Sequence, residues 1–119
     1  MPKIYLSPST QDWNMYVTGS GSEEYNMNLL ADALVPYLLS NGIQYQRNRP
    51  EMTAGSSIRE ANQGEYDLYL ALHSNAAPEG RYGEERGIIA FYYPGSVGGQ
   101  RAAELIAQEL RKIYPLPNK

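Results

Sequence analysis

The only histidine of this chain, His73, stands where a reactive or ligand-binding side chain is expected. It follows directly after an alternating apolar run, 67–72, and precedes a small, polar, turn-prone segment. A histidine at the end of a strand can serve as a structural cap that hydrogen-bonds a carbonyl group. It can also serve as a metal ligand. Residue type alone leaves both roles open for His73.

Glu23 and Glu24 are the second candidates. They open an expected helix, where the positive end of the helix dipole favours carboxylates, so a helix-start charge is one interpretation. The start of this helix is also expected on the edge of the sheet where His73 ends its strand. A histidine nitrogen and a glutamate oxygen are common parts of a zinc site. The pattern therefore indicates a metal site as the alternative.

Apolar periodicity and turn residues predict the elements that must position these side chains. Pro36 falls inside the first helical pattern and is expected to kink a helix that otherwise remains whole. Ser57 and Glu60 have the spacing of a capping box. The expected strands cover 3–6, 43–48, 67–72 and 87–93, and the expected helices cover 23–40, 57–62 and a stretch from about residue 96.

This order predicts a single-domain α/β fold, with a mostly parallel sheet and helices on both of its faces. In such sheets, ligands bind beyond the carboxyl ends of the strands. The loops Ser7–Ser22 and Ser74–Glu85 are therefore the expected walls of a site, and His73 lies between the third strand and the second of these loops.

Composition excludes several classes of function. The net charge of −3 argues against nucleic acid as a main partner. The chain has no cysteine, no apolar run long enough to span a membrane and no secretory signal core at its N-terminus. Its eleven tyrosines, against one phenylalanine and one tryptophan, suit either half-buried positions or a surface that meets sugars or peptides.

Several segments resemble the zinc-dependent N-acetylmuramoyl-L-alanine amidases of the type 3 family. The stretch His73-Ser74-Asn75-Ala76 resembles their H-x-N-A motif, and Glu24–Ala31 resembles the start of their first helix. Further segments resemble the family in the same order along the chain, namely Tyr5–Gln11, Arg47–Pro50, Ser57–Asn62 and Arg86–Ile88.

The resemblance implies an amidase-like domain over residues 1–119, a peptidoglycan hydrolase of the endolysin or autolysin kind. It would cleave the bond between N-acetylmuramic acid and the L-alanine of the stem peptide, at the cell wall outside the cytoplasm. Glu24 and His73 would be zinc ligands, Asn75 would contact the substrate, and the muropeptide would be the partner.

Two departures from the family limit this expectation. The loop after the first strand has no histidine, so Gln11 or Asp12 would have to replace the family's first ligand. The family's last strand and helix, with the catalytic glutamate, would lie beyond Lys119. We therefore expect an incomplete domain that is inactive or nearly so, and that self-associates through an uncovered sheet edge.

A second function follows from the same fold, a catalytically inactive module that binds muropeptides. Tyrosines such as Tyr82, Tyr92 and Tyr93 would form its binding surface. A nucleotide-binding α/β domain is a third, weaker hypothesis, because neither a G-x-G-x-x-G motif nor a P-loop follows any expected strand.

Overall fold

The computed structural model describes residues 2–12, 15, 19, 21–49, 51–74 and 89–113. Its internal contacts divide the chain into two units, Met1–Asn75 and Ala76–Lys119, and each is described by itself. The first unit contains the sheet together with Glu23, Glu24 and His73. None of the described helices is long and apolar enough to cross a membrane.

The first unit is built on a parallel sheet of three strands. β1 (Lys3–Pro8) lies in the centre, between β2 (Gln44–Arg47) and β3 (Leu68–Leu72). Both pairings are parallel. Five consecutive residues of β1 are buried, as expected for a strand that is covered on both faces. The described part of the chain is therefore of the α/β class with a parallel sheet, as the sequence predicts.

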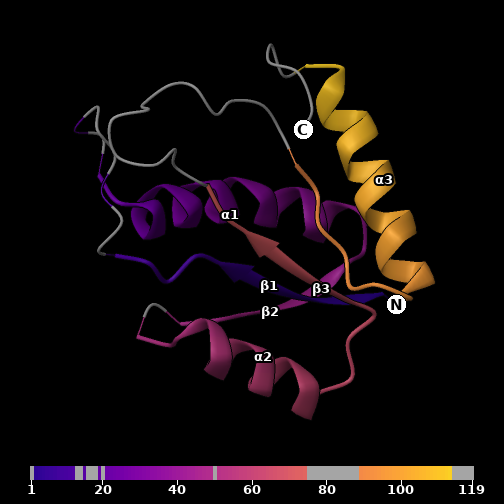
Figure 1. Ribbon diagram of the computed structural model, residues 1–119, viewed down its shortest axis with the longest axis horizontal. Helices are drawn as coiled ribbons and strands as arrows, with labels where there is room; N and C mark the ends of the chain where they lie inside the picture. Colours follow the sequence, from indigo (N-terminus) through magenta and orange to yellow (C-terminus); the bar gives the residue numbers. More distant parts are fainter. Residues whose placement is uncertain are drawn as a thin grey trace. The chain divides into compact units, whose positions relative to one another are not determined.

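α1 (Glu23–Ser40) covers one face of this sheet (Figure 1). The core between them contains Ile4 and Leu6 of β1 and Ala31 and Leu38 of α1. Alternation along β1 sends these two strand side chains to the same face. The helix remains continuous through Pro36, whose ring is the predicted source of a kink.

α2 (Ala54–Gln63) lies on the opposite face of the sheet (Figure 1). Its start corrects the predicted capping box of Ser57 and Glu60. The helix is capped one turn earlier by Thr53, which accepts from the backbone N–H of Ser56 while the Ser56 hydroxyl bonds back to the Thr53 backbone. The Glu60 carboxylate instead bonds Tyr5 across the interface with the sheet, at 3.0 Å.

The second unit is described over residues 89–113. A turn through Pro94 and Gly95 leads to the N-cap Ser96 and to α3 (Val97–Arg111). Ser96 accepts from the N–H of Gly99, at 3.0 Å. Gly95 has φ +88°, a left-handed backbone that glycine adopts without strain.

The fourth strand predicted over 87–93 is wrong for residues 89–93, which form no strand. Residues 87 and 88 lie outside the described part of the chain. A run of apolar and aromatic residues that ends at Pro94 and Gly95 suggested a strand here, but strand structure requires a neighbouring strand as hydrogen-bond partner. No described residue of this unit forms one, and the Phe91 and Tyr93 side chains are largely exposed.

Candidate functional site

His73 lies directly after β3, at the edge of the sheet where the parallel strands end. The N–H of Ser9 donates to the carbonyl oxygen of Leu72 at 2.9 Å, so the pairing between β1 and β3 continues up to the histidine. The His73 side chain is 41% exposed. The sheet therefore fixes the backbone of His73 and leaves part of its imidazole open, at the edge that the sequence predicts.

Glu23 is the carboxylate that meets His73. Its Oε2 atom lies 2.9 Å from Nδ1 of the imidazole, and the Glu23 side chain is only 2% exposed. Removing a carboxylate from water is costly unless hydrogen-bond donors or positive charge compensate. Glu23 gains both, because it is the first residue of α1, where the helix dipole is positive, and because it faces the imidazole.

Glu24 lies beside this pair, with its side chain half-buried. Its backbone N–H donates to the carbonyl oxygen of Gln11 at 3.3 Å. Successive side chains of an α-helix point about 100° apart, so Glu23 and Glu24 cannot both approach His73 in the same way. The structure brings Glu23 to the histidine, and the ligand role predicted for Glu24 stays a prediction.

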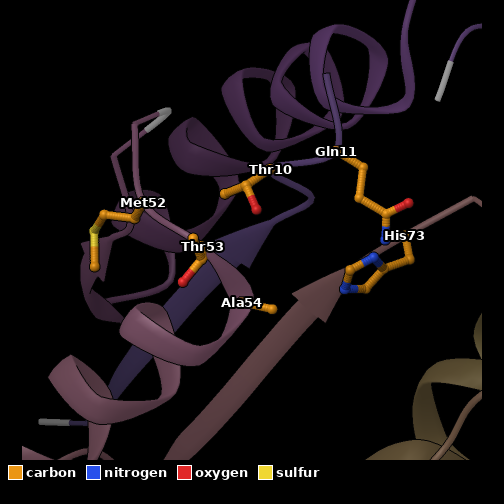
Figure 2. A pocket seen from close by; sticks show the side chains of 6 residues that line it. All are labelled: Thr10, Gln11, Met52, Thr53, Ala54 and His73. Carbon is orange, nitrogen blue, oxygen red and sulfur yellow. The ribbon is translucent and has the colours of Figure 1, made fainter. Parts of the chain in front are cut away.

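A cavity of about 190 Å³ opens beside His73 (Figure 2). Three segments form its walls: the residues after β1, the residues that lead into α2, and the end of β3. Gln11, one of the two predicted substitute donors, is among the lining residues, whereas the exposed Asp12 is not. The lining residues are Thr10, Gln11, Met52, Thr53, Ala54 and His73.

Both backbone polar groups of Gln11 make hydrogen bonds, so its backbone is fixed on either side of the Cα atom. Its N–H donates to the Ser9 hydroxyl at 3.1 Å, and its carbonyl accepts from the N–H of Glu24.

Asn75, the predicted substrate-binding residue, lies outside the described residues, as does Tyr82.

Asn48 is a structural component of the site that the sequence did not reveal. It is buried just after β2, and its side-chain N–H₂ group lies within hydrogen-bond distance of Ser7 Oγ (3.2 Å), the Pro8 carbonyl (3.1 Å) and Ser57 Oγ (3.1 Å). One amide therefore ties the end of β1 to the first turn of α2, and these adjoin two of the three segments that line the cavity. A polar residue at the carboxyl end of a predicted strand is the only sequence signal for this role.

Tyr5 joins the sheet to α2 farther from the cavity. Its buried ring stacks on Tyr69, and its hydroxyl donates to Glu60 Oε1 at 3.0 Å. Glu60 also pairs with Arg49, at 3.3 Å. Burial raises the pKa of Tyr5 above its ordinary value, and the hydrogen bond to Glu60 and the charge of this carboxylate raise it further. Tyr5 is therefore a neutral hydrogen-bond donor over the physiological pH range.

The donor atoms of His73 and Glu23 suit a zinc ion chemically, because zinc takes imidazole nitrogen and carboxylate oxygen. A catalytic zinc site normally has three protein ligands and one open position. Within the described residues, no group of three His, Cys, Asp or Glu side chains comes together. The neutral amide of Gln11 is the further donor that the cavity places near the pair.

Comparison with protein-family models, with curated proteins and with solved structures finds no match for this chain. A function therefore has to be inferred from the sequence and from the geometry around His73.

Proposed function

We propose that this chain is a zinc-dependent peptidoglycan hydrolase that cleaves the amide bond between N-acetylmuramic acid and the L-alanine of the stem peptide. The observation that carries the proposal is the contact of His73 with Glu23, whose nearest atoms lie 2.9 Å apart. The pair lies at the carboxyl edge of a parallel sheet, which is where α/β proteins bind their ligands. The resemblance of the surrounding segments to cell-wall amidases supplies the substrate class.

In this proposal, His73 and Glu23 hold the metal ion. Glu23 takes the role that the resemblance gives to Glu24, because it is the carboxylate in contact with the imidazole. A bound zinc ion would supply a Lewis acid for the scissile carbonyl and would lower the pKa of a water molecule. Gln11 offers an amide oxygen as a third donor, which is a weaker zinc ligand than the histidine of the family.

The remaining contacts of the site keep these donors in place. The sheet fixes the backbone of His73 through the bond between Ser9 and Leu72, and burial holds the Glu23 side chain in one position. Metal sites gain affinity when surrounding groups orient their ligands in this way. The place of action is the bacterial cell wall, where the substrate is found.

Two measurements on one preparation test the proposal. The protein is loaded with zinc, freed of excess metal, and its zinc content is measured by mass spectrometry. Purified peptidoglycan is then incubated with the protein and examined for newly formed alanine N-termini. We expect close to one zinc per chain and its loss in His73→Ala. Release of alanine N-termini should be slow at most, in keeping with the expectation of a nearly inactive domain, and should disappear in His73→Ala. A chain that retains no zinc and releases none would contradict the proposal.

A second candidate function is a non-catalytic module that binds muropeptides. The observation in its favour is the exposure of Tyr92 and Tyr93 in the second unit, 45% and 81% respectively. Exposed aromatic rings can stack on sugar rings or peptide groups while their hydroxyls hydrogen-bond. A metal-free protein that binds a muropeptide without cleaving it, and that loses this binding in Tyr93→Ala, would favour this function over the hydrolase.

A further inference from the structure

A second, smaller cavity adjoins the one beside His73. Its volume is about 20 Å³. A volume of roughly 10–15 Å³ is enough for one water molecule, provided that the water finds two to four polar partners. Thr10, Ala54 and His73 line both cavities (Figure 2). The remaining lining residues of the small cavity are Ser7, Pro8, Ser9, Asn48 and Tyr69. The space therefore suits a single water molecule.

Two buried serines reach this cavity because of the alternation along β1. Ser7 lies within the strand, and Ser9 follows two residues later, still bonded through its N–H to Leu72 of β3. Ile4 and Leu6 face α1, so Ser7 and Ser9 belong to the opposite face, which α2 covers. Both serines are almost completely buried. Buried hydroxyl groups normally find hydrogen-bond partners in the protein or in a bound water.

Asn48 contributes an acceptor to the same place. Its N–H₂ group lies 3.1 Å from the Pro8 carbonyl, which can only accept, and 3.1 Å from Ser57 Oγ. The Ser57 hydroxyl already donates to the Thr53 carbonyl at 2.9 Å, so it also accepts from Asn48. These contacts define which end of the Asn48 amide carries the nitrogen. The amide oxygen, Oδ1, then lies on the other side, and none of the described residues donates to it.

Ser7 and Ser9 each keep one hydroxyl hydrogen. The Tyr69 hydroxyl donates to Ser7 Oγ at 2.9 Å, and the N–H of Gln11 donates to Ser9 Oγ at 3.1 Å. Both serines therefore act as acceptors in these bonds. Across the ranges that the structure describes, no protein acceptor takes the hydrogen of either serine. Two donors and one acceptor thus remain among the groups that line the small cavity.

We propose that the small cavity binds one water molecule as a fixed part of the site. The water accepts from the hydroxyls of Ser7 and Ser9 and donates to Asn48 Oδ1, which uses both of its lone pairs and one of its hydrogens. Its second hydrogen is left for an acceptor in the larger cavity, which shares three lining residues with the small one. The water joins β1 to the segment after β2, and its binding does not depend on the proposed function.

A high-resolution crystal structure of the full chain tests this inference without any substitution. We expect one peak of electron density at about 2.6–3.2 Å from Asn48 Oδ1 and from the hydroxyls of Ser7 and Ser9. A cavity without density, or density beyond this distance from Asn48, would overturn the inference. Oxygen distances of about 2.0–2.5 Å would also overturn it, because they are typical of a bound metal cation.

A measurement in solution counts the bound water. The magnetic relaxation of ¹⁷O in water reports water molecules that stay long inside a protein. Ser9→Val places methyl groups in the cavity and removes one donor, so it should lower this count by about one water relative to the wild type. Ser40→Val is the matched control, because Ser40 is an exposed serine of α1 that does not line the cavity, and it should keep the wild-type count.

The fold of Ser9→Val is checked first by urea titration, because this variant also loses the acceptor of the Gln11 N–H. A folded Ser9→Val that retains the wild-type count would overturn the inference. If the variant does not fold, Ser9→Thr replaces it, because threonine keeps the hydroxyl and adds one methyl group to fill the space. The same loss of about one water is then expected, and an unchanged count would again contradict the water site.

Discussion

Glu23 and His73 are 50 residues apart in the sequence, and their side chains meet at 2.9 Å. One begins α1 and the other follows β3, so the contact forms only when the helix packs on the sheet. The pair joins a nearly inaccessible carboxylate to an imidazole that is partly open to solvent. Any ion or substrate would therefore approach the histidine, with Glu23 beneath it.

Zinc affinity should depend on Glu23 and not on its neighbour. We expect Glu23→Gln to weaken zinc binding by about tenfold or more, the range seen when a residue that holds or orients a metal ligand is removed. Glu24→Gln is the matched control at the same helix start and should leave the affinity within about twofold of the wild type. Competition with a chelating dye measures both constants. A larger loss of zinc affinity in Glu24→Gln than in Glu23→Gln would instead identify Glu24 as the zinc ligand.

Replacing Asn48 should destabilise the first unit. Asn48→Ala leaves Ser7, Pro8 and Ser57 without a shared buried donor, which should cost about 1–3 kcal/mol of unfolding free energy. Urea titration measures the change. Asn62→Ala, at an exposed position of α2, is the control and should change stability by less than about 0.7 kcal/mol. Equal stability of the two variants would contradict a structural role for Asn48.

Tyr5 should make stability fall at alkaline pH. Folding raises the pKa of this phenol above its ordinary value near 10. Below that value both states keep the proton, so the contribution of Tyr5 is fully present. As the pH rises further, the unfolded chain releases the proton while the folded chain retains it, and the unfolding free energy decreases until the folded-state pKa is passed.

Urea titrations from about pH 8 to about pH 11 follow this change in stability. Tyr5→Phe has no phenol to titrate and should show a shallower decline than the wild type. Tyr37→Phe removes a phenol that is 70% exposed and should keep the wild-type profile. An unchanged alkaline slope in Tyr5→Phe would show that another group causes the decline.

Self-association through β3 is a further expectation. Within the described residues, β3 pairs with β1 alone, and its sequence LYLAL is apolar throughout. Exposed apolar edge strands pair readily with other chains, and a lysine on the edge discourages this. Ala71→Lys should therefore lower the concentration-dependent increase in mass seen by light scattering, whereas Ala33→Lys on α1 should not. A wild type that remains monomeric at all concentrations would contradict the expectation.

Local pattern was sufficient to predict the framework of the site. An alternating apolar run that ends at Leu72 predicted β3, and the parallel order of strands then placed His73 at the ligand edge. The choice between Glu23 and Glu24 was not available from sequence, because two identical side chains differ only in their angle around the helix axis. That angle is set by how α1 packs on Ile4 and Leu6.

The errors arose where contacts distant in sequence compete with local ones. Ser57 and Glu60 match a capping box, yet Glu60 bonds Tyr5, 55 residues away, and Thr53 caps the helix instead. The apolar and aromatic run over 89–93 is typical of a strand, but a strand also needs a neighbouring strand to pair with, and a local sequence pattern does not show whether one is present. Asn48 was missed for the same reason, because its bond to Ser7 spans 41 residues.

The bonds of Asn48 also bear on how the site opens. Because the Asn48 amide contacts both β1 and α2, detachment of α2 from the sheet would break these bonds and dismantle the cavity walls in the same event. The cavity and the helix should then behave as one cooperative unit in hydrogen exchange. A ligand seated beside His73 would slow amide exchange along the whole of α2, including turns that it never touches.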